Sequence, residues 1–197
     1  MIVFSIAGHP RDVSPSVLPL AAARTGDRAA IDEVVAWAAP LVIGWCRRVG
    51  GRGVHADDAA QDVLVVLYTR ISHVPDAIRP WLWGVTRRVL AAHRRRAWVR
   101  RWLPGLVADP VDPTPDVVRR LESDAALRFV DATLARMPLA QREVFVLCDI
   151  EGHTDEEAAE LTGASVGTTK SRLRLARARF AACLQEDAAS SLAVEAP

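Results

Sequence analysis

The chain has 197 residues, half of them apolar and a quarter charged, and a formal net charge of +1. These totals exclude a disordered tail and a fibre, and they predict a globular chain of one domain or two small ones. The charge is nevertheless segregated, since residues 77–108 carry eight arginines without a carboxylate and residues 161–185 carry five cations without one. A nearly neutral total therefore does not exclude a polyanionic partner.

The cysteines and the apolar segments bear on the compartment. Cys46, Cys148 and Cys183 are odd in number and never form a CxxC pair, which favours neither a disulfide framework nor a zinc site. The N-terminal apolar run is short and is interrupted from Pro10 onward. We see no later stretch that approaches the roughly 20 apolar residues of a membrane span. We therefore expect a cytoplasmic protein that is neither exported nor inserted in a membrane.

Prolines divide the chain into two blocks. The segment WLPGLVADPVDPTPD, residues 102–116, has four prolines, which forbid a continuous helix and favour extended backbone. Neither block has the alternating pattern of a β-strand, so we expect an all-α chain of two small helical domains joined by a flexible linker. The expected parts are a flexible N-terminal segment (1–20), a first domain (21–101), the linker (102–121), a second domain (122–187) and a flexible tail (188–197).

The first block begins with several helices, which we expect to be separated by GGRG at 50–53 and by Pro75 and Pro80. Residues 55–70, HADDAAQDVLVVLYTR, start with acids and then become apolar. Asp58, Gln61 and Asp62 recur at helical spacing and therefore share one acidic face. Taken alone, this face is either a solvated surface that complements the helix dipole or a docking site.

A second helix of the first block is predicted over residues 79–102, RPWLWGVTRRVLAAHRRRAWVRRW. Helical spacing predicts a core stripe of Leu82, Val85, Val89 and Ala92. The same spacing places a second set of side chains on the opposite, outward side of the helix: Arg87, Ala91, Arg94 and Trp98. Guanidinium groups bind phosphates and aromatic rings stack on unpaired bases, so this mixture favours single-stranded nucleic acid. The alternatives are a solvated face or contact with an anionic membrane, and for Trp81 and Trp83 ordinary core packing.

Residues 154–180 carry the pattern of a helix-turn-helix. Thr154 is an N-cap for a helix with acids in its first turn, and Gly163 follows the small Ala159 by four residues, which allows close packing of a second helix. Ser165 offers the next cap. The core stripe of the second helix is predicted to be Val166, Thr169, Leu173, Ala176 and Phe180, and its outward face Thr168, Ser171, Arg172, Leu175 and Arg179.

The outward face of this second helix suits the major groove. Arg172 can fork onto guanine, and Thr168 or Ser171 can reach base edges or phosphates. Three flanking cations would contact phosphates: Lys170, Arg174 and Arg177. The alternative is a solvated cationic helix on a small bundle.

Catalytic signals are not found in the sequence. The histidines are scattered, and His153 near Cys148 is a pair without further ligands. Converging carboxylates, an activated nucleophile and a Walker-type phosphate loop are not found either. We therefore expect no enzyme, no metal and no cofactor.

Taken together, the segments resemble the extracytoplasmic-function (ECF, group 4) sigma factors of bacterial RNA polymerase, in the sigma-70 family. HADDAAQDV is similar to the polymerase-docking helix of that family, and RPWLWGVTRRVLAAHRRR to its promoter-melting and minus-ten segment. MPLAQREVFVLCDIEGHTDEEAAELTGASVGTTKSRLRLARARF is similar to its minus-thirty-five reader. The resemblance implies a factor that binds core RNA polymerase, directs it to promoters and assists melting.

The resemblance also implies which residues make these contacts. The clamp helices of the largest polymerase subunit would meet Asp57, Asp58, Gln61 and Asp62. The minus-ten DNA would meet Ser72, His73, Val74, Asp76, Trp83, Arg87, Arg88, Arg94 and Arg95, and the loop from Ser72 to Ile78 falls where family members capture a flipped base. The minus-thirty-five DNA would meet Ser165, Thr168, Thr169, Lys170, Ser171, Arg172, Arg174 and Arg179.

The same resemblance implies three kinds of partner: core polymerase, including the flap region of its second-largest subunit; promoter DNA; and an anti-sigma protein. Three positions depart from many family members. Those members have Asn where this chain has Arg88, Asp where it has Ala92, and a branched apolar residue where it has Thr169. The promoter sequences therefore do not follow from the resemblance. The rival hypothesis is a stand-alone helix-turn-helix regulator that binds an operator as a dimer, with the first block as a sensor.

Overall fold

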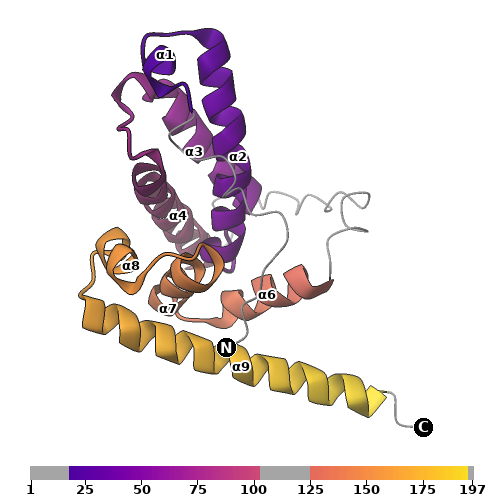
Figure 1. Cartoon of the computed structure of the whole chain (residues 1–197). Coiled ribbons are helices and arrows are strands. Elements are labelled where there is room, and N and C mark those ends of the chain that lie inside the picture. Colours follow the sequence, from indigo (N-terminus) through magenta and orange to yellow (C-terminus); the bar gives the residue numbers. More distant parts are fainter. Residues whose placement is uncertain (1–17, 103–124, 195–197) are drawn as a thin grey trace. The chain divides into compact units, whose positions relative to one another are not determined.

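The computed structural model describes residues 18–102 and 125–194, with side chains over 18–99 and 129–186. The chain divides into two compact units between Pro104 and Gly105 (Figure 1). All regular structure in the described ranges is helical. This confirms the predicted all-α fold. The linker region 103–124 lies outside the described residues.

The N-terminal unit is built from α1 (Leu20–Arg24), α2 (Arg28–Gly50), α3 (Ala56–Thr69), the short turn η3 (Ile71–His73) and α4 (Ile78–Trp102). Asp27 caps α2, because its carboxylate accepts a hydrogen bond from the Ala30 amide at 3.1 Å. Gly51 and Gly53 follow α2 with φ of 82° and 75°, a left-handed backbone that ends the helix where GGRG predicts a break.

Pro80 does not separate two helices as expected. It lies in the first turn of α4, where its missing N–H has no helical partner to lose. Pro40 even lies inside α2, which continues to Gly50. Pro75, in contrast, lies in the non-helical segment between η3 and α4, as expected.

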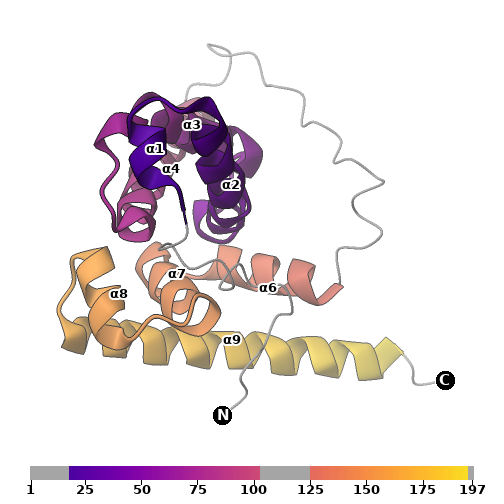
Figure 2. The ribbon, with the colours of Figure 1, turned by 45° about the horizontal axis from the view of Figure 1, so that its top comes forward.

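The core of the N-terminal unit lies where α2, α3 and α4 pack on one another (Figure 2). At its centre the indoles of Trp45 and Trp83 meet edge to face, with ring centroids 5.2 Å apart. Val34 and Val42 from α2, and Val63 from α3, are also fully buried in this core. This packing fixes which side of each helix is left for partners.

The buried side of α4 differs from the predicted stripe. Leu82 and Val85 are buried as expected, but the buried arc continues through Thr86 and Leu90, whereas Val89 and Ala92 are only half-buried. The reason is that α4 contacts both α2 and α3, so a wide arc of its side chains is buried. The centre of this arc is rotated by about one residue from the predicted stripe. The exposed side is turned by the same amount.

Helix α2 bears on the expectation about membranes. It is long and apolar enough to span a bilayer, by length and composition only, although half of its most apolar window is buried in the unit. Trp37, Leu41 and Trp45 of this helix belong to the core. A core helix of this kind passes the same test, so α2 is weak evidence for a membrane span.

The C-terminal unit contains α6 (Ala125–Arg136), α7 (Leu139–Phe145), a π-helical turn η4 (Val146–Ile150), α8 (Asp155–Thr162) and α9 (Val166–Val194). The shorter helices lie along α9 (Figure 1). Phe180 of α9 stacks on Phe145 with ring centroids 5.1 Å apart and meets Phe129 of α6 edge to face. The buried Arg142 donates to the carbonyls of Ala135 and Met137, both at 2.9 Å, and so caps the end of α6.

The helix-turn-helix is confirmed in detail. The Thr154 hydroxyl accepts from the Glu157 amide at 3.2 Å, and the Glu157 carboxylate accepts from the Thr154 amide at 2.8 Å, which completes a capping box. Gly163 ends α8 with φ of 70°, and the Ser165 hydroxyl accepts from the Thr168 amide at 3.2 Å to cap α9. Thr169, Leu173, Ala176 and Phe180 are buried as predicted.

The expected loose ends are partly wrong. Leu18 and Leu20 are buried in the N-terminal unit, so order begins before residue 21. Helix α9 continues to Val194, well past the predicted domain end at residue 187. Residues 1–17 and 195–197 lie outside the described part of the chain.

The capping box of α8 generates a pH-dependent prediction. The hydrogen bond from the Thr154 amide holds the pKa of Glu157 below its ordinary value. Because the folded pKa is the lower one, this stabilisation is present above the unfolded pKa and is lost as pH falls through the folded pKa. We expect amide-exchange protection of α8 to weaken on acidification, and Thr154→Ala to remove about 1 kcal/mol of it at pH 7.

The matched control is Glu157→Gln, which keeps a capping oxygen but does not titrate. Its α8 protection should lose the acid dependence. An unchanged pH profile in Glu157→Gln would show that other groups govern the opening of α8.

Candidate polymerase-docking and DNA-binding surfaces

The exposed side of α3 is longer than the sequence pattern indicates. Asp58, Gln61 and Asp62 are exposed on one face, as predicted. The same face continues into Val65 and Tyr68, which are 53% and 45% exposed. These two side chains extend the acidic face with apolar surface. Sequence reasoning missed both residues, although Val65 follows Gln61 by four residues and Tyr68 follows Val65 by three, a spacing that could have revealed them.

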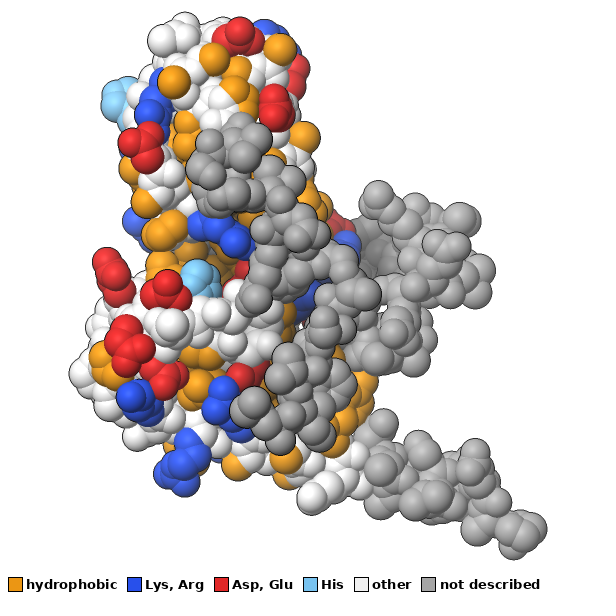
Figure 3. Space-filling view, in the orientation of Figure 1, with side chains coloured by type: hydrophobic (Ala, Val, Ile, Leu, Met, Phe, Trp, Pro, Cys, Tyr) orange, Lys and Arg blue, Asp and Glu red, His pale blue; other side chains and the backbone are white. Residues whose placement is uncertain are grey.

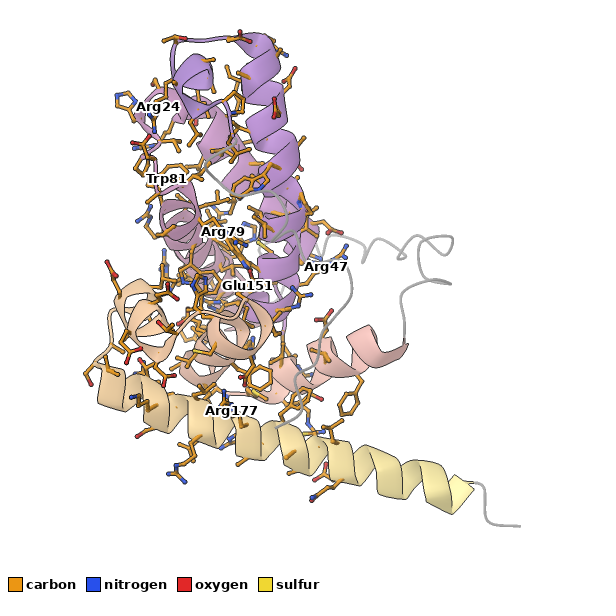
Figure 4. The ribbon with its side chains drawn as sticks, viewed as in Figure 1. Arg24, Arg47, Arg79, Trp81, Glu151 and Arg177 are labelled. Atoms are coloured by element: carbon orange, nitrogen blue, oxygen red, sulfur yellow. The ribbon has the colours of Figure 1, made fainter. Side chains whose placement is uncertain are left out.

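Two of the four predicted docking acids and amides already have partners. Arg47 of α2 (labelled in Figure 4) lies 3.4 Å from the Asp57 carboxylate, and His93 of α4 lies 2.8 Å from that of Asp62. Asp58 and Gln61 form no side-chain hydrogen bond or ion pair with any residue in the described part of the chain. They are therefore the predicted residues most open to a partner.

The loop between α3 and α4 exposes polar side chains around one buried anchor. Ser72, His73 and Asp76 are exposed, and the Ser72 hydroxyl lies 2.8 Å from Nδ1 of His73. Val74 is buried at 2% exposure, so the prediction that its side chain contacts DNA is wrong. Its role in this loop is to hold the backbone against the core.

The arginines of α4 divide into two groups. Arg88 and Arg95 are exposed, whereas Arg87 and Arg94 are half-buried, and Arg94 donates to the Val49 carbonyl at 3.4 Å. Trp98 is 63% exposed on the same helix. Trp83 is buried against Trp45, so the prediction that it contacts minus-ten DNA is wrong and its core reading is correct.

Helix α9 presents its predicted polar residues with one exception. Ser165, Thr168, Lys170, Ser171 and Arg174 are exposed, and Arg172 is half-buried. Figure 3 shows acidic side chains gathered over α8 and cationic ones along the N-terminal part of α9. Lys170 lies 3.9 Å from Glu156 of α8. Thr169 is fully buried, so the prediction that it contacts minus-thirty-five DNA is wrong.

Two arginines further along α9 have other surroundings. Arg177 forms a two-pronged ion pair with Asp149, with nitrogen–oxygen distances of 2.6 and 3.0 Å (Figure 4), and this hydrogen bonding raises the pKa of Arg177. It therefore fastens α9 to η4, contrary to the expected phosphate contact. Arg179 is exposed and lines a hollow of about 230 Å³ with residues of α6, two helical turns from Arg172.

Among the described residues, the thiols of Cys46 and Cys148 are wholly or partly shielded from solvent and His153 pairs with a carboxylate. Burial, with help from Asp155 and Asp149, raises the pKa of the Cys148 thiol to about 12, and burial raises that of Cys46 to about 12. His153 instead lies 3.4 Å from Glu157. In the two described ranges, no group of three or more His, Cys, Asp or Glu side chains could hold a metal ion.

Comparison with known proteins now decides between the two hypotheses. Residues 37–100 match the family described as Sigma-70 region 2, and residues 130–180 match Sigma-70, region 4. The ECF RNA polymerase sigma factor SigD of Mycobacterium tuberculosis is 32% identical over 180 residues, which cover 85% of this chain and 81% of SigD. The chain belongs to the ECF sigma factors of the sigma-70 family.

Other relatives agree. The ECF sigma factor EcfG of Rhodopseudomonas palustris is 30% identical over 161 residues, which cover 80% of this chain and 86% of EcfG. The solved structure of CnrH in complex with the cytosolic domain of CnrY is similar with a TM-score of 0.59 at 25% identity, and covers 85% of this chain and 96% of CnrH. RpoE in complex with the anti-sigma factor NepR from Bartonella quintana has a TM-score of 0.55 at 25% identity, covering 74% and 93%.

This sigma factor binds RNA polymerase and gives it promoter specificity in transcription initiation. The two matched regions fall one in each compact unit. The rival hypothesis of a stand-alone regulator is therefore wrong. Sigma factors are initiation factors and leave bond-making to the polymerase.

The two indoles of the N-terminal unit give a prediction that separates core packing from DNA contact. Trp83→Ala removes a fully buried ring from the Trp45 contact and should cost about 3 to 5 kcal/mol of the unit's stability. Trp98→Ala is the matched control, since its ring is mostly exposed, and should change the free energy of unfolding by no more than about 0.5 kcal/mol. Urea unfolding of the full chain, followed by amide exchange of α2 and α4, measures both. Equal losses would contradict the assigned core.

Proposed function

We propose that the N-terminal unit of this sigma factor docks on core polymerase through the exposed face of α3. That face, which we name the docking face, consists of Asp58, Gln61, Asp62, Val65 and Tyr68. Its acidic start complements a basic partner, and its apolar end adds area that leaves water on binding. The observation that supports the proposal best is that Asp58 and Gln61 are exposed and have no side-chain partner among the described residues.

The partner surface on the polymerase is proposed to be the clamp helices of the largest subunit, with the flap of the second-largest subunit against the C-terminal unit. Asp57 lies at the edge of the docking face and is paired with Arg47. It is proposed to shape the surface more than to contact the partner. The polymerase works in the cytoplasm, which is the proposed compartment.

The minus-ten DNA is proposed to meet the loop after α3 and the exposed side of α4. Ser72, His73 and Asp76 offer hydrogen-bonding groups to an unpaired base, and Arg88 and Arg95 offer charge to the phosphates beside it. Arg87 and Arg94 are half-buried and are proposed to support this surface from its edge. Binding unpaired bases lowers the free energy of the open promoter and so assists melting.

The minus-thirty-five DNA is proposed to meet the N-terminal half of α9. Thr168, Ser171 and Arg172 lie on one side of that half, and Arg172 has the fork geometry that reads guanine. Ser165, Lys170 and Arg174 are proposed to contact phosphates. Arg179 lies two turns further along, beside α6, and is proposed to reach at most the flanking backbone.

An anti-sigma protein is proposed as a further partner. RpoE was solved in complex with the anti-sigma factor NepR, and CnrH in complex with the cytosolic domain of CnrY. The exposed docking face and the cationic sides of α4 and α9 are the surfaces that such a partner would have to cover to keep this chain from polymerase and promoter.

The docking face is tested by charge reversal. Asp58→Lys with Asp62→Lys should abolish co-purification with core polymerase, because the introduced lysines would repel a basic partner surface. Glu33→Lys on α2 is the control for added positive charge. His93→Ala is the control for the lost ion pair at Asp62, and both controls should retain binding. Retained binding by the double reversal, with normal helicity, would place the docking face elsewhere.

The minus-thirty-five surface is tested by three arginine variants. Arg172→Ala should relax base preference at one position and cost about 1 to 3 kcal/mol of discrimination in a randomised-promoter selection. Arg174→Ala should weaken all sequences alike, as expected for a phosphate contact. Arg177→Ala should leave base preference unchanged, since Asp149 holds that side chain. A base preference that survives Arg172→Ala would refute the assigned role.

A further inference from the structure

One arginine near the start of the N-terminal unit forms hydrogen bonds with the loop between α3 and α4. Arg24, the last residue of α1, donates from Nε to the Val74 carbonyl at 2.8 Å and from Nη2 to Oδ1 of Asp76 at 2.7 Å (Figure 4). These bonds join residues 50 and 52 positions apart. One guanidinium therefore holds both the backbone and an acidic side chain of this loop.

The surroundings fix the direction of the Asp76 carboxylate. Val74 before it and Ile78 after it are buried, and the Ile78 amide donates to the Asp76 carbonyl at 2.8 Å. The planar guanidinium offers its N–H groups in a rigid fork, and its two bonds reach the Val74 carbonyl and one oxygen of the Asp76 carboxylate, so it holds that oxygen at a set place relative to the loop backbone. The Asp76 side chain is nevertheless 93% exposed, against 28% for Arg24. The carboxylate is held in place and still open to a ligand.

An ion pair this exposed contributes little to folding. Its geometry is better suited to aligning the loop than to stabilising the unit. The loop carries no other charged side chain between Ile71 and Ala77 apart from the titratable His73. Asp76 therefore sets the charge and the hydrogen-bonding character that the loop offers to a base.

A carboxylate only accepts hydrogen bonds. Cytosine and adenine offer an exocyclic amino donor to it, as does guanine, and acidic side chains read cytosine in this way. Thymine offers a single N–H between two carbonyl oxygens, which would repel the carboxylate. A fixed carboxylate therefore discriminates by chemistry between amino-bearing bases and thymine.

We propose that Arg24 is a positioning residue that directs the Asp76 carboxylate at the unpaired base of the minus-ten element, so that the loop selects an amino-bearing base over thymine. This inference rests on the proposed role of the loop in minus-ten binding. Arg24 acts through Asp76 and does not itself touch the base.

The test is a promoter library, randomised across the non-template minus-ten element, transcribed by core polymerase with the full-length chain. The unsubstituted chain should deplete thymine at one position. Arg24→Ala should reduce that depletion at least about five-fold and leave the other positions unchanged. Arg24→Lys, which keeps the charge but not the fork, should restore it only in part. Asp76→Asn, which adds a donor at nearly the same shape, should admit thymine at the same position.

Arg28→Ala is the matched control, because Arg28 forms an exposed ion pair with Asp32 at 3.6 Å on the neighbouring helix and has no bond to the loop. It should keep the full depletion. Co-purification with core polymerase and helicity, measured for each variant, report whether the fold survives. If Arg24→Ala fails to fold, Asp76→Asn decides alone.

The inference is overturned if Arg24→Ala or Asp76→Asn lowers transcription equally for every library member, or if the unsubstituted chain tolerates thymine throughout the element. If the unsubstituted chain starts no transcription with core polymerase, the proposed function itself fails. The two failures are therefore distinguishable.

Discussion

The burial of one side of two long helices governs what this sigma factor can bind. In α4, the contacts with α2 and α3 bury Leu82, Thr86 and Leu90 and leave Arg88 and Arg95 exposed. In α9, the contacts with α7 and α8 bury Leu173 and Ala176 and leave Thr168 and Ser171 exposed. A small domain has few ways to bury enough apolar surface, so the core decides which polar side chains remain for the partner.

Local signals were sufficient to predict the helix-turn-helix. Its capping box, its left-handed glycine and its second cap are each local, since the residues that form each feature lie within four positions of one another. The rotation of α4 could not be predicted in this way, because it depends on two other helices that contact it. The same is true of Trp83, whose type suits DNA contact as well as burial, whereas helical spacing alone predicted the burial of Thr169.

Long-range ion pairs account for the remaining differences between the predicted and the observed surroundings of charged side chains. Asp149 captures Arg177 from 28 positions away, His93 meets Asp62 across 31 positions, and Arg24 reaches Asp76 across 52. A helical wheel treats each of these side chains as a free surface charge. Only the packing of the helices shows that Arg177 pairs with Asp149 inside the C-terminal unit, and that Asp58 and Gln61 are the polar members of the proposed docking face without a side-chain partner among the described residues.

Each DNA surface in this account is small, with a few arginines and hydroxyl groups and a single helix or loop. Such surfaces bind weakly when separate, and fastening both to one polymerase raises the effective concentration of each at its own promoter element. This explains why a chain with a net charge of only +1 can serve as a DNA-binding factor. Specific recognition is expected to belong to the assembled holoenzyme.

The most direct measurement is therefore run-off transcription on genomic fragments, with core polymerase alone, with core polymerase and this chain, and a parallel DNA-binding titration of the chain by itself. The account predicts discrete new start sites only when both are present, and weak binding of the same fragments by the isolated chain. Tight, sequence-specific binding by the isolated chain, with start sites unchanged when it is added to core polymerase, would contradict it.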